Sequence, residues 1–241
     1  MVGLCGLLLA LMAGCAATVT ALKHKDLAVQ TRLSETIFLD PVAPAQQTVW
    51  LEGKSTADQP VELAALREAL TARGYRVVTD PDQAHYWMQV HVRYAGKAAP
   101  AAIDQTLGGG FGGPLAGVLG GATAGAVWGG SGRAVGIGAG VGGLLGAAAE
   151  TISGALVKAV IYTVITDVQL SERATGPVAQ QHTATLSQGT QTQIRQEVAE
   201  TSGWKRYRTR VAATATKVNL RFEEAQPALE QGLVRSLAGL L

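Results

Sequence analysis

Cysteine is almost absent from the chain. Only two cysteines occur among 241 residues, and both fall within the first fifteen positions. The rest of the chain therefore has no thiol for a disulfide framework or for a thiolate metal site. A length of 241 residues is enough for one sizeable domain, or for one domain that carries a membrane insertion.

Charge is scarce as well. Charged residues make up 16% of the chain, whereas about 25% is typical of a soluble domain. The formal net charge is +2, and the charges are scattered along the chain. A nucleic-acid partner is not expected, because such partners select a strong and clustered positive charge.

Recognisable catalytic patterns are also missing. The chain contains neither a Gly-x-Ser-x-Gly elbow nor a His-Glu-x-x-His helix motif. None of the four histidines has a second ligand at metal spacing, and about 20 Å of strand backbone would separate His85 from His91. Glu223 and Glu224 suit the first turn of a helix, although an acid/base pair is the alternative. We expect no enzyme, no catalytic or metal-binding residue and no cofactor.

The N-terminus lacks charge and is rich in leucine. Residues 1–14 are too short to span a bilayer, which needs about 20 apolar residues, and they are predicted to be a secretory signal peptide, although no basic residue opens it. The run ends Leu11-Met12-Ala13-Gly14-Cys15, which resembles the bacterial lipobox. We therefore expect a covalent lipid on Cys15 and a lipid-anchored segment over residues 15–34. The alternative is a buried cysteine at the end of a core helix.

The identity of the next residue indicates a destination. Ala16 follows the cysteine, and in enterobacterial lipoproteins, which this region resembles, a residue other than Asp at that position implies transport to the outer membrane. We expect a lipid-anchored protein of the cell outer membrane.

Beyond residue 34 the pattern alternates between strand and helix periodicity. Alternating apolar and polar residues predict strands at 34–40, 48–53, 75–79 and 85–94, and longer β-rich runs at 157–170 and 207–222. The strand at 85–94 has an apolar face and a second face that carries Trp87, Gln89, His91 and Arg93. Residues 171–203 are polar and show no period, which predicts a long loop or a partly paired edge.

Two segments show helical spacing. A short helix is predicted around residues 61–70, with Asp58 as its cap and Gly74 just past its end. Pro227 is predicted to open a last helix with leucines at i+4 spacing. The fold class is therefore α+β, with a mixed or antiparallel sheet and two or more helices, divided into halves at residues 35–104 and 151–241.

A glycine-rich segment separates the two halves. Apart from Arg133, residues 105–149 carry no charge, and glycines recur at a spacing of four. A helix would place these residues on one face and let two backbones approach closely. We expect a glycine-zipper transmembrane hairpin over residues 105–150, with Ser131 and Arg133 at its turn. A flexible linker or a phosphate-binding loop is the alternative. The predicted packing positions are Gly109, Gly113, Gly117, Gly121, Gly125, Gly129, Gly136 and Gly140.

A basic cluster lies near the end of the polar stretch. Lys205, Arg206, Arg208 and Arg210 alternate with uncharged residues, as on one face of a strand. The cluster is interpreted as a solvated strand face, and contact with lipid headgroup phosphate or lipopolysaccharide is the alternative.

Five separated segments resemble the TraT family of conjugative plasmids. They read LSETIFLDP at 33–41, GYRVVT at 74–79, YW at 86–87, YTVITDVQ at 162–169 and KVNLRFEEA at 217–225. The order along the chain is the same, and the glycine segment stands in the same place. The resemblance is specific because the matching segments are dispersed from residue 15 to the C-terminus.

The resemblance implies an outer-membrane lipoprotein that is exposed at the cell surface and assembles as a homo-oligomer. It implies surface exclusion, in which a plasmid-bearing cell blocks mating contact from another donor, and an association with complement resistance. Its expected partners are outer-membrane lipid, other copies of the chain, and a mating-pair or pilus component of the donor cell. The alternative function is an oligomeric glycine-zipper ring that forms a pore or supports the envelope.

Overall fold

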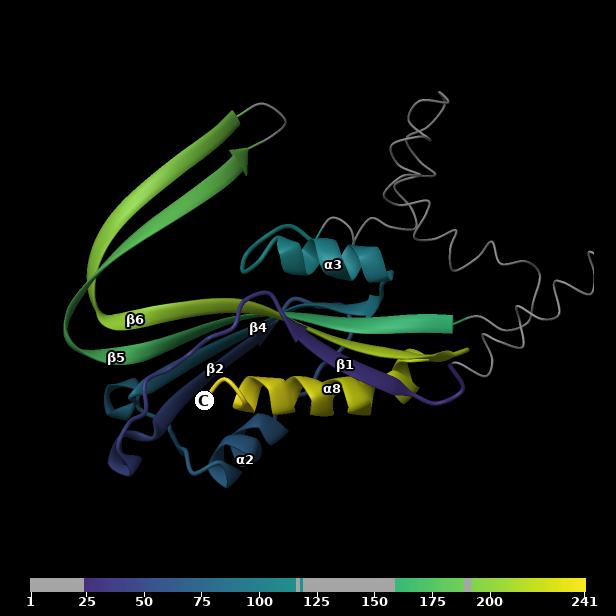
Figure 1. The fold of residues 1–241 in the computed structure, drawn as a ribbon, viewed down its shortest axis with the longest axis horizontal. Coiled ribbons are helices and arrows are strands. Elements are labelled where there is room, and N and C mark those ends of the chain that lie inside the picture. The colour runs from purple at the N-terminus through teal and green to yellow at the C-terminus, as the bar shows by residue number, and fades with distance from the viewer. Residues whose placement is uncertain (1–23, 116–117, 119–158, 189–191) are drawn as a thin grey trace, which may run out of the picture.

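The computed structural model describes residues 24–115, 118, 159–188 and 192–241. Six strands and three α-helices make up this part of the chain, with two short 3-10 turns between them (Figure 1). In chain order they are β1 (Ala28–Leu33), β2 (Thr48–Ser55), α2 (Ala65–Ala72), β3 (Arg76–Val78), β4 (Tyr86–Lys97), α3 (Pro100–Gly108), β5 (Ala159–Gln188), β6 (Thr192–Val218) and α8 (Phe222–Ala238).

The six strands form one mixed sheet in the order β1-β6-β5-β4-β2-β3. The pairs on the β1 side of β4 are antiparallel, and the pairs of β2 with β4 and with β3 are parallel. Helices α2 and α8 lie on one side of the sheet, whereas α3 lies on the other side (Figure 1). The mixed sheet that the sequence predicted is present.

The hydrophobic core lies between the sheet and α8. The predicted alternation of β4 is confirmed as far as Val92, because Tyr86, Met88, Val90 and Val92 are all buried on this face. An irregularity between Val92 and Tyr94 ends it, and Tyr94 packs instead against the cluster that includes Ile103 of α3. Leu229, Leu233 and Leu237 of α8 are fully buried against the apolar face of β4. Burial of each such side chain contributes about 1.5–3 kcal/mol, so this layer is the main source of stability for the domain.

Several predicted boundaries are wrong by a few residues. The first strand is β1 at Ala28–Leu33 and not residues 34–40, because Ala28 to Leu33 pair with β6 along their full length. Helix α2 begins at Ala65 without a side-chain cap, so Asp58 does not cap it. The last helix begins at Phe222, and Pro227 lies inside it. The predicted end at Gly74 is confirmed by its φ of +94°.

A long hairpin occupies residues 171–203, where a long loop or a partly paired edge was predicted. Strands β5 and β6 stay paired from Ala159–Val218 to Gln188–Thr192, with one irregularity between Arg173 and Val178. Their far ends extend past the other strands and curl toward the side of the sheet that holds α3 (Figure 1). The prediction failed because backbone pairing between two adjacent segments needs no apolar period, which was the signal used.

The transmembrane helical hairpin is not supported, and the fold class requires correction on this point. No helix within the described residues is long and apolar enough to cross a membrane. The first apolar run, predicted to be helical from Gln105, stops being helical after Gly108. Gly110 and Gly112 have φ values of +62° and +72°, which an α-helix excludes. Residues 119–158, which include Ser131 and Arg133, lie outside the described residues.

Strand β1 reaches α8 through a glycine. A Cβ atom placed on Gly232 would lie 3.1 Å from Oγ1 of Thr31 and 3.3 Å from Cγ1 of Val29. The strand therefore packs directly on the backbone of the helix. Any larger side chain at position 232 must push the edge strand away from α8.

We expect Gly232→Leu to lower the free energy of unfolding by about 1–3 kcal/mol, the usual cost of overpacking. Urea unfolding followed by circular dichroism measures the change, and faster amide hydrogen exchange in β1 locates it. Gly203→Leu is the control, because a Cβ at Gly203 meets nothing within 4 Å. Equal stability of the two variants would show that β1 does not depend on this contact.

Candidate functional site

The face of the sheet opposite α8 is lined with polar and aromatic side chains. Strand register places these side chains in three parallel rows across β2, β4, β5 and β6. The rows are Trp50–Trp87–Ser171–Arg206, then Glu52–Gln89–Gln169–Arg208, then Lys54–His91–Asp167–Arg210. Alternation along each strand explains this face, since the intervening residues point into the core.

Aromatic rings pack along the first row. The ring centroids of Trp50 and Trp87 are 4.9 Å apart, and those of Trp87 and Trp204 are 6.2 Å apart in an edge-on arrangement. The guanidinium of Arg173 lies 4.5 Å from the Trp204 centroid. Three tryptophans and a cation thus stiffen this end of the face.

The second row is a continuous chain of hydrogen bonds. Gln89 Nε2 donates to Glu52 Oε2 at 2.8 Å, and Gln169 Nε2 donates to Gln89 Oε1 at 2.7 Å. Arg208 Nε then donates to Gln169 Oε1 at 2.8 Å. We call these four side chains the amide ladder. Each donor fixes the orientation of the next amide, so the ladder holds its remaining lone pairs and N–H groups in set directions.

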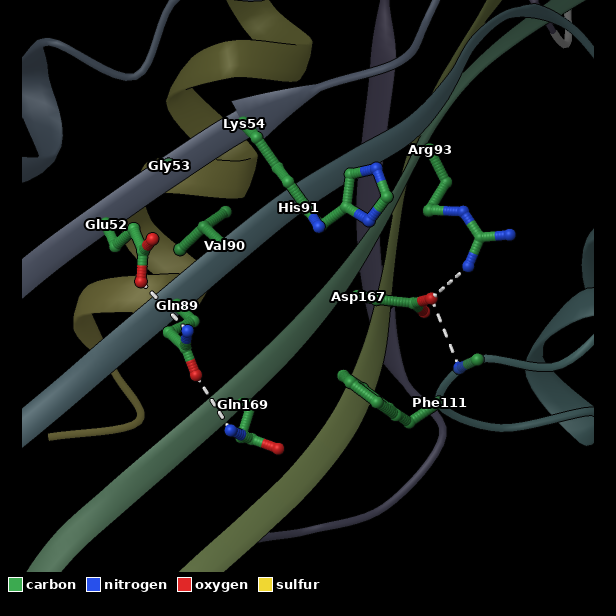
Figure 2. A pocket seen from close by; sticks show the side chains of 11 residues that line it. Glu52, Gly53, Lys54, Gln89, Val90, His91, Arg93, Phe111, Asp167 and Gln169 are labelled. Atoms are coloured by element: carbon green, nitrogen blue, oxygen red, sulfur yellow. Dashed lines mark hydrogen bonds and ion pairs between the residues drawn. The ribbon is translucent and has the colours of Figure 1, made fainter. Parts of the chain in front are cut away.

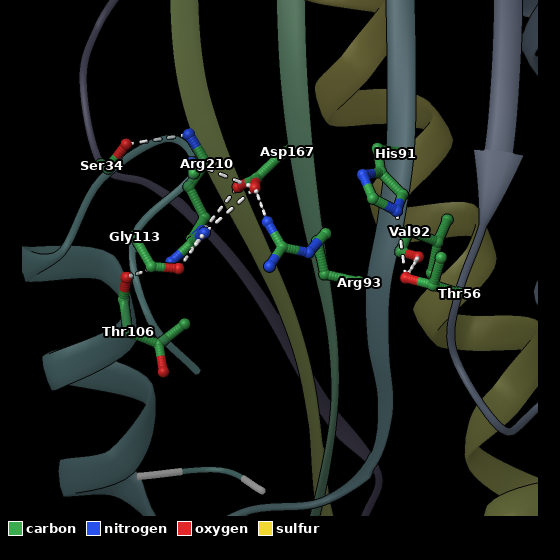
Figure 3. Close-up of polar contacts among 10 residues, drawn as sticks. Ser34, Thr56, His91, Val92, Arg93, Thr106, Gly113, Asp167 and Arg210 are labelled. Atoms are coloured by element: carbon green, nitrogen blue, oxygen red, sulfur yellow. Dashed lines mark hydrogen bonds and ion pairs between the residues drawn. The ribbon is translucent and has the colours of Figure 1, made fainter. Parts of the chain in front are cut away.

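The third row contains a buried ion cluster (Figure 3). Arg210 is 0% exposed, and its Nε lies 2.6 Å from Asp167 Oδ1 while its Nη2 lies 3.0 Å from Asp167 Oδ2. Arg93 donates to the same carboxylate at 2.7 Å from the other side. One buried carboxylate therefore serves two guanidinium groups, a bidentate pair and a single bond.

The same cluster fixes the chain that follows α3. Arg210 donates to the carbonyl oxygens of Thr106 at 3.0 Å and Gly113 at 2.9 Å. The backbone N–H of Gly112 donates to Asp167 Oδ2 at 3.1 Å. Glycine suits Gly112 because its φ of +72° disfavours a side chain. The loop from Gly109 to Gly113 is held against the sheet, with Phe111 carried on it.

A pocket of about 330 Å³ opens between the amide ladder and this loop (Figure 2). Glu52, Gln89 and Gln169 line one side of the pocket, and Lys54, His91 and Arg93 line the opposite side. Phe111, Gly112 and Asp167 close the end near α3. The Phe111 ring is 38% exposed, and the guanidinium of Arg208 lies 5.1 Å from its centroid.

The electrostatic balance of the pocket is positive. Lys54, Arg93, Arg208 and Arg210 line or adjoin it, against the two carboxylates of Glu52 and Asp167. Burial lowers the pKa of His91 below its ordinary value of 6.5, and the nearby charges of Lys54 and Arg93 lower this pKa further. His91 is therefore neutral at pH 7, and its Nε2 lies 3.0 Å from the hydroxyl oxygen of Thr56.

Sequence comparison places this architecture in a family. The profile described as "Enterobacterial TraT complement resistance protein" matches residues 26–241 of the chain. A protein from Escherichia coli strain K12 named "TraT complement resistance protein" is 41% identical over 232 residues, which cover 95% of this chain and 93% of that protein. The chain belongs to the TraT family. The resemblance stated from five segments is thereby confirmed.

Other relatives carry the same name. A second Escherichia coli protein named "TraT complement resistance protein" is 39% identical over 95% of this chain and 92% of its own length. One from Wigglesworthia glossinidia brevipalpis is 28% identical over 81 residues, a third of each chain. The region matched by the TraT profile includes every residue of the pocket and of the amide ladder.

Most of the site residues that the sequence predicted for this TraT-family chain are not part of the pocket. Cys15 and the packing positions from Gly117 to Gly140 lie outside the described residues, and so do Ser131 and Arg133. Gly109 follows the end of α3, and Gly113 packs against the backbone of Gly109 within the loop. The glycine stripe stays a prediction from the sequence.

The members of the basic cluster do not share one environment in the structure, and neither do His85 and His91. Arg210 is buried in an ion pair, so the four basic residues do not form one solvated face. His85 lies beside Glu172, with 3.9 Å between Nε2 and the carboxylate, whereas His91 lines the pocket. Sequence reasoning missed Asp167, Glu52 and Phe111 as parts of a site. The only available signal was the polar face of β4, which carries Gln89, His91 and Arg93.

Removal of the Arg210 guanidinium should destabilise the domain. We expect Arg210→Met to lower the free energy of unfolding by about 3–5 kcal/mol, because it removes the bidentate partner of a buried carboxylate and the donor to two carbonyls. Urea unfolding of the full chain measures the loss, and hydrogen exchange should speed up in α3. Arg235→Met is the matched control at an exposed arginine of α8. A loss of unfolding free energy no larger than that of Arg235→Met would show that the Arg210 ion pair does not hold the domain together.

The environment of His91 gives a second test. We expect nuclear magnetic resonance titration of the histidine rings to give His91 a pKa below 6.5. Lys54→Met should raise this pKa, since removal of a nearby positive charge stabilises the imidazolium form. Lys25→Met, an exposed lysine outside the pocket, should leave it unchanged. A His91 pKa that does not respond to Lys54→Met would show that the two side chains do not interact.

Proposed function

We propose that this TraT-family chain is an outer-membrane lipoprotein, anchored through Cys15, that protects the cell surface by contact and not by catalysis. Its two activities are resistance to complement and surface exclusion against donor cells. The observation that carries the proposal is the 41% identity to the Escherichia coli "TraT complement resistance protein" over 95% of the chain. Coverage of this extent makes a shared activity the simplest inference.

The polar face supports a binding role. Its carboxylates already accept hydrogen bonds, since Asp167 is bonded to two arginines and Glu52 accepts from Trp87 and Gln89. A general base needs a carboxylate or imidazole that is free to accept a substrate proton. A rigid face of aromatic, amide and cationic groups suits recognition better than proton transfer.

Assembly with other copies of the chain is part of the proposal. Phe38 is 84% exposed on the segment between β1 and β2, and Val29 and Leu33 of β1 are exposed as well. Strand β1 is also an edge strand with one side unpaired within the described sheet. Exposed apolar side chains beside an open strand edge favour contact with another protein surface. The donor-cell partner would be a mating-pair or pilus component.

The proposal predicts two cellular phenotypes when the gene is expressed alone in a plasmid-free recipient. Survival in normal serum should rise, and the frequency of plasmid transfer from a donor should fall, each relative to an empty vector. Heat-inactivated serum is the control for complement. Cys15→Ser should abolish palmitate labelling and both phenotypes, because the protein loses its anchor.

Each result has a distinct meaning. Serum survival equal to the empty vector would refute complement resistance, and unchanged transfer would refute surface exclusion. Retention of palmitate label by Cys15→Ser would place the lipid on another residue.

A further inference from the structure

The pocket between the amide ladder and Phe111 combines three kinds of group. It has planar hydrogen-bonding side chains in Glu52, Gln89 and Gln169, an exposed aromatic ring in Phe111, and cations in Lys54 and Arg93. Its volume of about 330 Å³ lies at the lower end of the range for small-molecule sites. The pocket therefore fits a small ligand.

The amide ladder selects a ligand with many hydroxyl groups. Each amide uses only part of its capacity in the ladder, because a primary amide has two N–H donors and a carbonyl with two lone pairs. Glu52 likewise accepts from Trp87 and Gln89 and has no cation partner within the described residues. A row of fixed donors and acceptors on neighbouring strands matches the closely spaced hydroxyls of a sugar. An apolar ligand would leave these groups unpaired.

Phe111 supplies the surface on which a sugar ring can lie. The ring is 38% exposed and lines the pocket, and the loop that carries it is fixed by Asp167 and Arg210. The C–H groups on one face of a pyranose are apolar and pack on an aromatic ring. A rigid aromatic wall beside a polar wall is thus complementary to the two sides of a sugar ring.

The cations select a ligand with a negative charge. Lys54 has no ion-pair partner in the part of the chain that the structure describes, and Arg93 uses one N–H group for Asp167. The remaining donors of Arg93 can bind a carboxylate or phosphate oxygen. An anion would satisfy the positive balance of the pocket, whereas a cationic ligand would meet repulsion.

We propose that this pocket binds a negatively charged sugar, a pyranose unit that carries a carboxylate or a phosphate. The ring lies on Phe111, its hydroxyls bind the amide ladder, and the acidic group binds Lys54 and Arg93. The inference stands on the geometry of the pocket and does not depend on complement resistance or surface exclusion.

Saturation-transfer-difference nuclear magnetic resonance on the purified full chain tests the proposal with four probes. Methyl glucuronide and glucose 6-phosphate carry sugar and charge, methyl glucoside carries sugar alone, and inorganic phosphate carries charge alone. One or both charged sugars should bind at least tenfold more tightly than methyl glucoside and inorganic phosphate. The bound charged sugar would also show whether the acidic group is a carboxylate or a phosphate.

Two variants localise the binding. Lys54→Met should weaken binding of the charged sugar about tenfold, the usual effect of losing one charge-assisted hydrogen bond, and Lys25→Met is the matched control. Phe111→Ala should remove saturation transfer to the ring protons of the sugar. Circular dichroism and the urea midpoint establish that each variant is folded.

Three outcomes would overturn the proposal. Inorganic phosphate that binds as tightly as the charged sugars would mean a simple anion site. Equal binding of methyl glucoside would exclude a role for the cations. Absence of binding by all probes, or binding that neither variant changes, would mean that this pocket does not take sugars.

Discussion

The ion pair between Asp167 and Arg210 is the contact on which the polar face depends. It joins the neighbouring strands β5 and β6, and through Arg210 it also holds the carbonyls of Thr106 and Gly113. A buried pair of this kind adds little net stability over an apolar contact. Its effect is on position, because Arg210 holds the carbonyls of Thr106 and Gly113 while Asp167 accepts from the N–H of Gly112, and these bonds fix the loop that carries Phe111. The pocket is therefore a product of one ion cluster and the register of four strands.

The two faces of the sheet have different roles. On the α8 side, leucines and valines exclude water and supply the free energy of folding. On the other side, side chains of the same strands hydrogen-bond to each other across the strands, from Glu52 to Arg208. The apolar face keeps the strands in register, and the register in turn sets the spacing of the polar groups. The arrangement of polar groups on one face thus depends on packing on the other.

The sequence predicted the first of these faces much better than the second. The alternation of β4 and the leucine spacing of α8 are local patterns, and the structure confirms both. Asp167 and Arg210 are 43 positions apart, and only the pairing of β5 with β6 brings them together. No local pattern encodes that pairing. The helical hairpin was predicted from glycine spacing, yet positive φ angles at Gly110 and Gly112 end the helix just where that spacing begins.

The strand order has a consequence for the timing of folding. Strand β1 is made first but pairs only with β6 in the described sheet, through residues 211–216, and then packs on α8. Strand β4 likewise meets its neighbour β5 only after a long intervening segment has been made. Pairings so distant in sequence form slowly, because closing the intervening loop costs conformational entropy before the strands gain any contacts. The chain can therefore complete its sheet only when β6, which ends at Val218, has emerged from the ribosome, so any earlier step meets a chain that has not yet folded.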